Sequence, residues 1–552
     1  MSLSARLPLL ATPTPSLLRS LGEAVPTDGD RVVGRAPGPG EQYRFHVDMA
    51  GCIGCKCCVV ACNEQNGNPA SINWRRVAEI EGGWYPHTQR AYLSMGCNHC
   101  VEPTCLTGCP VDAYTKEPLS GIVRHSADAC IGCQYCTWNC SYGVPQYNPE
   151  RGVVGKCDMC HGRLELGQAP ACVSACPEGA IGIEIVKVAE WRAALEGARG
   201  DDGMPTGDGS LSTTRVTLPD GLPPDAKPVD LTHVRPAEPH WPLVIMTVLT
   251  QLSVGAFATI WLLQVSGAST RLDVAALTSL VLSGLALAAS TLHLGRPAYA
   301  YRAVKMWRRS WLSREILLFT AFSAVAGAYA AVLWLGLPGG SVLGLLTLVF
   351  GAGGVAASGC IYRVPSRPAW NTRFTLVQFL LTAGALGPLF AGAVGAGGER
   401  WVAVAAACMA GGQLLLLAVR ALSLMASDRI ELRGTARLLS TTLRPLFLVR
   451  GVLLAVGGVI VPLLVAGLGP AEAGPYVQTF AGAGPYVQTL AGAGAYVQTD
   501  VGAGFSRPDV LIALAFVLAV AGEILGRYLF FVSVVPVHMA SPYLRLGQEA
   551  AA

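Results

Sequence analysis

Seventeen of the nineteen cysteines lie between Cys52 and Cys176, in four runs. The first and third runs have the spacing C-x2-C-x2-C-x3-C. In this spacing, three closely spaced thiolates bind one [4Fe–4S] cluster and the fourth thiolate reaches a neighbouring cluster. The second and fourth runs lengthen the gap before the third cysteine but keep the last spacing. The runs therefore predict sixteen ligands, enough for four [4Fe–4S] clusters: Cys52, Cys55, Cys58, Cys62, Cys97, Cys100, Cys105, Cys109, Cys130, Cys133, Cys136, Cys140, Cys157, Cys160, Cys172 and Cys176.

Disulfides and zinc sites are the other common uses of clustered cysteines. Repeated two-residue spacings are typical of metal ligation rather than of a secreted scaffold. Tetrahedral zinc does not need a fourth cysteine three residues behind a triplet, which disfavours this alternative. Cys57 is left over, and its use in place of Cys58 would break the two-residue spacing. We expect Cys57 not to be a ligand.

The charged residues are distributed unevenly along the chain. Only 14% of the 552 residues are charged, whereas about 25% is usual for soluble proteins. Residues 1–240 carry 20 Lys and Arg and 26 Asp and Glu, and residues 241–552 carry 20 and 10. This argues against a single soluble enzyme. The net charge of +4 comes without a basic and aromatic stripe, so no nucleic-acid partner is expected.

Eight long apolar runs follow residue 240. Runs of about 20 residues, rising about 1.5 Å per residue, cross a hydrocarbon layer of about 30 Å. Eight in succession leave no polar outer layer, which disfavours buried helices of a soluble protein. The sequence thus predicts an α+β ferredoxin-like four-cluster iron–sulfur domain followed by an all-α eight-helix transmembrane bundle. The predicted spans are roughly 241–265, 274–294, 314–335, 341–362, 374–396, 401–425, 446–468 and 510–535.

The remaining segments have no predicted role in chemistry. Residues 1–45 are rich in Pro, Gly and small polar residues and are expected to form a flexible extension. After the cluster domain (46–195), residues 196–239 are expected to be a linker or a strap. Within the membrane block (240–545), the 470–509 loop holds a ten-residue repeat that is too short for a packed solenoid unit. We expect this loop to face solvent.

The order and gaps of the four runs over residues 46–190 resemble the iron–sulfur electron-transfer subunit of the dimethyl sulfoxide reductase family of molybdenum enzymes. Some relatives have Trp at the third position of the second run and bind a three-iron cluster. Cys105 stands there in this chain, so the resemblance implies four [4Fe–4S] clusters. It also implies the ligand sets: Cys52, Cys55, Cys58 with Cys176; Cys62 with Cys157, Cys160, Cys172; Cys97, Cys100, Cys105 with Cys140; and Cys109 with Cys130, Cys133, Cys136.

The membrane block resembles the heme-free anchor subunit of the same family. A diheme cytochrome b is the alternative, but each heme needs two axial His, and His293 is the one His inside the block. No heme is therefore expected. The resemblance implies that His293 and Glu315 serve a site for menaquinol, with quinone as an exchangeable substrate. It rests on the segments 290–297, 307–317, 362–370 and 522–527.

Physical chemistry agrees with these two roles. Quinol oxidation releases protons with the electrons, so a titratable group near the quinone oxygens is needed, and His is suited to it. Ionisable groups inside a membrane are costly and functional by default. The alternative is an interfacial ion cluster of His293, Arg296 and Glu315. A second possible function is a cluster scaffold without quinone chemistry. A proton-pumping conduit is disfavoured, because it needs a chain of buried carboxylates and only Glu315 and Glu523 lie in or near the spans.

The loops of the membrane block differ in positive charge. Loops 295–314, 363–373 and 420–450 hold 15 Lys and Arg, whereas the four loops of the other side hold 3. This bias places the former loops, the amino terminus and the cluster domain on the cytoplasmic side of a bacterial inner membrane. The start of the sequence also shows no export signal. The orientation favours cytoplasm-facing relatives, such as complexes that oxidise sulfite or phenylacetyl-CoA and reduce quinone.

The expected partners follow from what the chain leaves out. Clusters, linker and anchor use up the 552 residues, and none of them resembles a molybdopterin-binding chain. We therefore expect a separate molybdopterin catalytic subunit, together with the membrane lipid and its quinone pool. The chain itself would be an electron-transfer subunit of an oxidoreductase.

Overall fold

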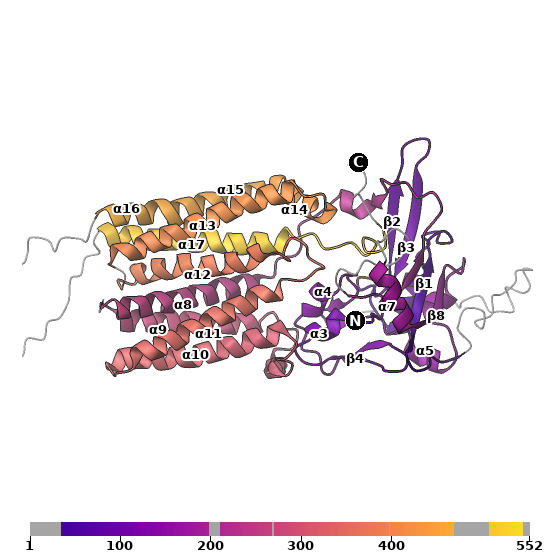
Figure 1. Cartoon of the computed structure of the whole chain (residues 1–552), viewed down its shortest axis with the longest axis horizontal. Helices are drawn as coiled ribbons and strands as arrows, with labels where there is room; N and C mark the ends of the chain where they lie inside the picture. Colours follow the sequence, from indigo (N-terminus) through magenta and orange to yellow (C-terminus); the bar gives the residue numbers. More distant parts are fainter. Residues whose placement is uncertain (1–34, 198–209, 268–269, 397, 469–506, 545–552) are drawn as a thin grey trace, which may run out of the picture.

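The computed structural model describes residues 35–197, 210–267, 270–396, 398–468 and 507–544. Most of the expected 1–45 extension, part of the 196–239 segment and nearly all of the 470–509 repeat loop lie outside these residues. The described residues form a small α+β domain that sits on one end of a long helical bundle (Figure 1). This is the predicted fold class.

Two small sheets frame the α+β domain. In the first, β1 (Glu41–Asp48) lies between β8 (Ile181–Lys187), which is antiparallel to it, and β9 (Arg215–Thr217), which is parallel. In the second, β2 lies between β10 and β3. The segment after residue 209 thus adds an edge strand to each sheet. The remaining strands are β2 (Arg76–Gly82), β3 (Gln89–Met95), β10 (Lys227–Pro228) and the hairpins β4 (Tyr114–Lys116)–β5 (Val123–His125) and β6 (Gln146–Asn148)–β7 (Val153–Gly155).

Short helices carry the later cysteines of each run. They pack in two pairs, α2 with α6 and α3 with α4, so that one helix of each pair comes from an early run and the other from a late run. This pairing brings runs that are far apart in the sequence to the same place. The helices are α2 (Cys57–Asn66), α3 (Thr104–Gly108), α4 (Tyr135–Asn139), α5 (His161–Glu165), α6 (Ala171–Ser174) and α7 (Val188–Gly197), followed by the short turn η2 (Val229–Thr232).

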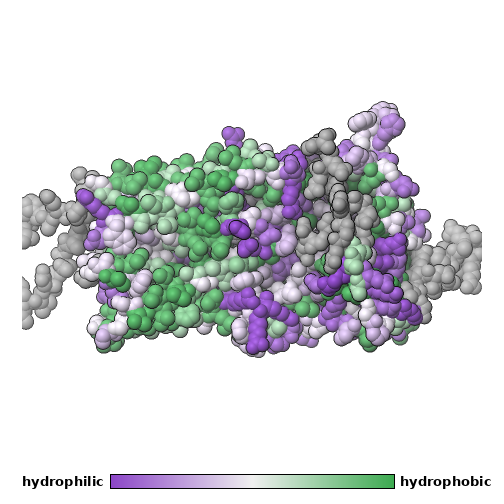
Figure 2. All heavy atoms as spheres, viewed as in Figure 1, coloured by the Kyte–Doolittle hydropathy of each residue, from purple (hydrophilic) through white to green (hydrophobic). Residues whose placement is uncertain are grey.

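Among the residues that the structure describes, the bundle contains eight helical spans that are long and apolar enough to cross a membrane, as predicted. Their outer surface forms a broad apolar belt, and hydrophilic residues gather at the end that meets the α+β domain (Figure 2). The chain is a multi-pass membrane protein. The spans are α8 (Trp241–Val265), α9 (Leu272–Thr291), α10 (Trp311–Leu335), α11 (Gly340–Ile361), α12 (Arg373–Ala393), α13 (Arg400–Met425), α15–η4–α16 (Arg444–Leu453, Leu454–Ile460, Val461–Leu468) and α17 (Arg507–Val532); η3 (Pro297–Val304) and α14 (Ile430–Ser440) lie in loops.

Helix α8 forms the centre of the bundle. It packs against α9, α11, α12 and α17, and 83% of its span is buried, compared with 28% for α10. Small residues allow the closest contact, because a Cβ at Gly255 of α8 would lie 1.9 Å from the Ala383 carbonyl oxygen of α12. Close packing over small residues is the usual way that helices associate in lipid.

The seventh span is not the continuous α-helix that its hydropathy predicts. Residues Leu454–Ile460 form a π-helical segment between α15 and α16. Pro462 explains the change, because proline has no N–H to donate and its ring clashes with the carbonyl group four residues earlier, at Gly458. A wider π turn accommodates both effects without ending the span.

The α+β domain is docked tightly on the bundle. The loop after α9 joins it through backbone hydrogen bonds from Gly295 N to Gly132 O (3.4 Å) and from Arg296 N to Ile131 O (3.1 Å). Trp138 of α4 inserts between aromatic rings of the bundle and lies 5.5 Å from the ring of Trp370. These contacts fix the distance between the cysteine-rich region and the helix ends.

Candidate functional site

The structure gathers the sixteen predicted ligands into four quartets. A quartet is a group of four cysteines whose thiols lie close enough to act on one another. In each quartet, burial raises the pKa of one thiol, and the charges of the three other thiols raise that pKa further. Each quartet combines cysteines from two runs, and the sets are those that the family resemblance implies. Around Cys52 the three thiols are Cys58, Cys176 and Cys55; around Cys62 they are Cys157, Cys172 and Cys160; around Cys100 they are Cys97, Cys140 and Cys105; around Cys136 they are Cys133, Cys109 and Cys130.

The quartets are not arranged around single ions. Within the described ranges, no three His, Cys, Asp or Glu side chains are placed to hold one metal ion. Zinc would need its four thiolates at about 2.3 Å from one centre, whereas a [4Fe–4S] cluster spreads its ligands over four irons. Backbone amides point at the sulfurs, including Gly132 N to Cys130 Sγ at 3.4 Å. The donor set therefore fits iron–sulfur clusters better than zinc.

The quartets form a line. The Cys58 thiol of the first quartet is an electrostatic neighbour of Cys172 in the second. Cys157 of the second quartet is a neighbour of Cys97 in the third. The buried Tyr114 lies beside thiols of both the third and the fourth quartets. We call this line the cysteine wire. Its first end is at the surface, where Cys55 is exposed.

Two buried cations lie along the wire, and the sequence analysis did not identify either. Arg75 is 1% exposed, and its charge acts on Cys172, Cys58, Cys157 and Cys62. Lys156 is 3% exposed, acts on Cys97 and Cys105, and donates a hydrogen bond to the Cys157 carbonyl at 2.8 Å. They offset the negative charge of closely spaced thiolates. Lys156 directly precedes Cys157, so the sequence offers a signal for its position beside a ligand. Arg75 has no such signal in the sequence, because only the fold of β2 places it beside the cysteines.

A cavity of about 150 Å³ lies where the last quartet meets the bundle. Both His293 and Glu315 line it, together with Cys133 of the fourth quartet. Its other walls are largely apolar, from the ends of α8, α9, α10 and α11. We call it the junction cavity. The structure thus places the two predicted site residues of the anchor beside a predicted cluster ligand.

His293 and Glu315 reach the cavity from different elements. His293 lies two residues beyond the end of α9, and its Nδ1 has no hydrogen-bond partner among the described residues. Burial lowers the pKa of His293 to about 4, so the imidazole is neutral near pH 7. Glu315 lies in the first turns of α10 and is 4% exposed. Tyr135 and Tyr362 add two hydroxyl groups that the sequence analysis did not assign to the site.

The sequence also allowed an interfacial ion cluster of His293, Arg296 and Glu315. The described part of the structure does not show this cluster. Arg296 donates to the Ala127 carbonyl of the α+β domain at 2.9 Å. Within the ranges that the structure describes, this contact to the other domain, and not an ion pair with Glu315 or His293, engages the guanidinium of Arg296. The arginine therefore holds the two domains together, and the junction cavity keeps an uncompensated carboxyl group and imidazole.

Comparison with known proteins gives matches to both parts of the sequence. Residues 236–437 match the family described as the DMSO reductase anchor subunit (DmsC), and residues 88–185 match the 4Fe-4S dicluster domain. One chain of the anaerobic dimethyl sulfoxide reductase of Haemophilus influenzae is 40% identical over 146 residues, which are 25% of this chain and 71% of that protein. This chain therefore belongs to the family of these iron–sulfur subunits.

Two further relatives are also similar to part of this chain. A subunit of the sulfite dehydrogenase of Allochromatium vinosum is 35% identical over 160 residues, covering 25% of this chain and 67% of that protein. The formate dehydrogenase iron–sulfur subunit of Haemophilus influenzae is 34% identical over 235 residues, covering 35% and 74%. The chain thus fuses an iron–sulfur subunit to a DmsC-type anchor, and this confirms the predicted resemblance. Electron transfer and membrane anchoring are its supported functions.

The assignment of Cys57 gives a first testable prediction. Its side chain is exposed, whereas that of the neighbouring Cys58 is buried among the quartets. We expect Cys57→Ser to keep an iron content of about sixteen per chain and Cys58→Ser to lower it, because only Cys58 has the ligand spacing. Iron and sulfide analysis of the purified proteins provides the measurement. Loss of iron in Cys57→Ser alone would show that the ligand assignment is wrong.

Proposed function

We propose that the chain carries electrons between membrane quinone and a separate molybdopterin subunit, through four [4Fe–4S] clusters held by the four quartets. One observation carries this proposal: the junction cavity contains His293, Glu315 and Cys133 together. A quinone head group bound there would be in contact with both a proton acceptor and a cluster ligand. No heme is needed in this scheme.

The side chains of the junction cavity would handle the protons. Quinol oxidation releases two protons and two electrons, and the clusters, when bound, accept the electrons one at a time. The neutral imidazole of His293 can accept a hydrogen bond and then a proton from one quinol oxygen. Glu315 provides a second acceptor from the opposite helix. The apolar walls exclude water, which strengthens these polar contacts.

The other end of the wire would deliver electrons to the catalytic subunit. Cys55 is exposed there, and the neighbouring Ile53 is 58% exposed, so an apolar and redox-active surface is available to a partner. The relatives are named as a chain or a subunit of a dimethyl sulfoxide reductase, a sulfite dehydrogenase and a formate dehydrogenase, which supports a separate catalytic partner. We propose that this partner covers the first quartet.

A quinone-linked experiment tests the function directly. The purified protein, in detergent and with its clusters oxidised, is mixed with a menaquinol analogue, and cluster absorbance is followed. We expect the analogue to reduce part of the clusters that dithionite, a stronger reductant, reduces. If dithionite reduces the clusters but quinols and quinones exchange no electrons with them, the cluster scaffold without quinone chemistry is the correct function.

The loop charges support a cytoplasmic cluster domain. The α+β domain docks on the end of the bundle that carries loop 295–314, which belongs to the side with 15 Lys and Arg. This orientation favours a second candidate function, a cytoplasm-facing complex that reduces quinone, for which the similarity to a sulfite dehydrogenase subunit is a specific precedent.

Reporter fusions decide between the two orientations. A reporter that is active only in the cytoplasm is fused after Ala552 and, separately, within residues 480–500. We expect activity at Ala552 and none in the loop, because eight spans return the polypeptide to the side on which it started. The reverse result would place the cluster domain outside, as in an outward-facing reductase.

A further inference from the structure

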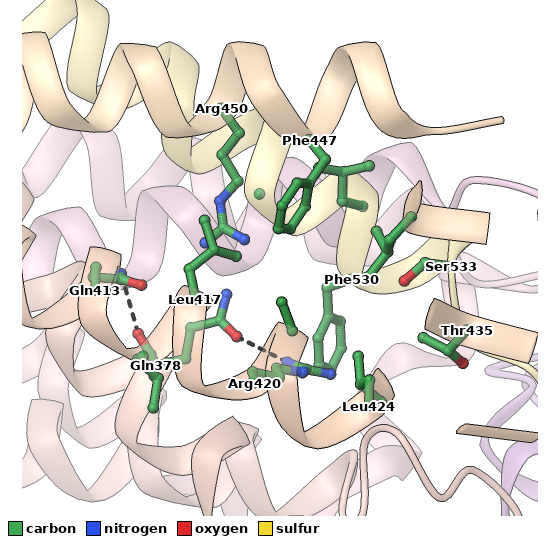
Figure 3. A pocket seen from close by; sticks show the side chains of 15 residues that line it. Gln378, Gln413, Leu417, Arg420, Leu424, Thr435, Phe447, Arg450, Phe530 and Ser533 are labelled. Atoms are coloured by element: carbon green, nitrogen blue, oxygen red, sulfur yellow. Dashed lines mark hydrogen bonds between the residues drawn. The ribbon is translucent and has the colours of Figure 1, made fainter. Parts of the chain in front are cut away.

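A second pocket lies within the bundle, away from the junction cavity. It has a volume of about 40 Å³ and is bounded by α12, α13, α14, α15 and α17. Figure 3 shows Arg450 entering it from one helix and Arg420 from the facing helix, with Phe447 and Leu417 beside them. Neither the quinone chemistry nor the cysteine wire uses these residues. We call it the arginine pocket.

Among the described residues, neither arginine of this pocket forms an ion pair, although Glu523 is an electrostatic neighbour of Arg450. Arg420 donates to neutral acceptors, the Gln378 side chain at 3.2 Å and the Ala369 carbonyl at 2.8 Å. Arg450 is 5% exposed, and its Nε has no hydrogen-bond partner among the described residues. The nearby Glu523 is bound instead by Thr382 (3.0 Å) and Gln413 (2.9 Å). Two buried cations inside a membrane protein require a counter-charge or a function.

The fold makes room for the Arg450 guanidinium. A Cβ at Gly526 of α17 would lie 2.4 Å from its Nε and 2.6 Å from its Cζ, so only glycine leaves this space. The guanidinium is therefore seated against α17, with its remaining N–H groups available to the pocket. A volume of about 40 Å³ holds roughly three water molecules, which is close to the size of one phosphate group.

The pocket lies near one end of the spans, close to the level of the lipid head groups. Arg420 lies five residues before the end of α13 and Arg450 six residues after the start of α15. At about 1.5 Å per residue, both lie roughly 8 Å inside the span ends. The outer faces of the two helices are apolar beside the pocket, with Leu415 67% exposed and Leu448 56% exposed. Acyl chains can lie against such faces.

The rim of the pocket is also basic. Arg429, Arg433 and Arg444 are exposed at α14 and at the start of α15, and Thr435 and Leu439 of α14 line the pocket. Exposed basic residues at this level attract anionic lipid head groups. Arginine binds phosphate oxygens through paired, charge-assisted hydrogen bonds.

We propose that the arginine pocket binds the phosphodiester of an anionic phospholipid, held between Arg420 and Arg450 with its acyl chains along α13 and α15. The lipid would add a second counter-charge to that of the buried Glu523, which acts on Arg450. A free phosphate ion has the same chemistry at the two guanidinium groups, but it would make no use of the apolar faces beside them.

The test compares lipids on the delipidated full-length protein by native mass spectrometry. Phosphatidylglycerol, phosphatidylcholine and inorganic phosphate are titrated separately and in competition. We expect phosphatidylglycerol to bind about tenfold more tightly than phosphatidylcholine, because the choline cation of phosphatidylcholine offsets the negative charge of the phosphodiester that both lipids carry. Equal affinity for the two lipids would overturn the proposal. Full displacement of phosphatidylglycerol by inorganic phosphate at equal concentration would overturn the lipid assignment and leave a phosphate site.

Four variants locate the binding. Arg450→Gln and Arg420→Gln are each expected to lower phosphatidylglycerol affinity about tenfold, and Arg444→Gln, which removes the same charge from the rim, by less than about threefold. Ala421→Trp fills the pocket without removing a charge and should also abolish the preference. Cluster absorbance and melting temperature establish that each variant is folded. Binding by folded Ala421→Trp or Arg450→Gln at the level of Arg444→Gln would overturn the proposal.

Discussion

Replacement of His293 by Ala is expected to slow quinol-linked cluster reduction by about 100-fold or more, the usual contribution of a positioned acid or base. Its imidazole is the one histidine in the lining of the junction cavity. Because burial lowers its pKa to about 4, it is neutral at any pH well above 4 and can accept a proton. Stopped-flow measurement of cluster absorbance with a menaquinol analogue provides the rate. Reduction by dithionite should remain unchanged.

Two further variants make this result specific. His233 is exposed and lies outside the cavity, so His233→Ala removes the same side chain without effect on the rate. His293→Gln keeps a hydrogen-bond acceptor but cannot be protonated, so it separates binding of quinol from proton transfer. A rate for His293→Ala equal to that of His233→Ala would remove His293 from the quinone site.

Gly295→Ala is expected to interrupt the same electron transfer without damage to either domain. A Cβ at Gly295 would lie 2.2 Å from the Gly152 carbonyl oxygen, which is backbone and cannot move aside like a side chain. Gly132 and Gly152, both with positive φ, form the other side of this contact. We expect about 1–3 kcal/mol of lost stability at the docking contact and a wider gap between the cavity and Cys133.

Gly284→Ala is the matched control for Gly295→Ala. Gly284 lies in α9, and a Cβ there would meet nothing within 4 Å. Both variants should retain full iron content, because neither residue is a cluster ligand. Quinol-linked reduction should fall at least tenfold in Gly295→Ala alone. Equal rates in the two variants would show that the tight contact at Gly295 does not govern electron transfer.

The sequence predicted the parts of the site that have fixed spacing. Ligand runs are local patterns, so the sixteen cysteines could be chosen by their gaps, and hydropathy gave the eight spans. Arg75 and Tyr135 could not be assigned, because their positions beside the wire and the cavity depend on how β2 and α4 pack.

Local irregularity and close contact between domains were equally hidden. The π-helical segment before Pro462 forms because proline cannot donate a backbone hydrogen bond within the helix. The mean hydropathy of the span does not reveal this effect. The role of Gly295 depends on a glycine 143 residues earlier in the sequence, Gly152, which no local pattern connects with it. The arginine pocket likewise arises from helices that meet only in the folded bundle.

The segment after α17 has a consequence for the order in which the protein is made. Met539, Ala540, Tyr543 and Leu544 are buried in the hydrophobic core of the cluster domain, and the Tyr543 hydroxyl lies 2.7 Å from the Ser212 hydroxyl. A ribosome makes the cysteine runs long before this segment. The core of the cluster domain therefore stays incomplete until all eight spans are inserted, so the cell's cluster-assembly machinery has the whole of translation in which to reach the cysteines.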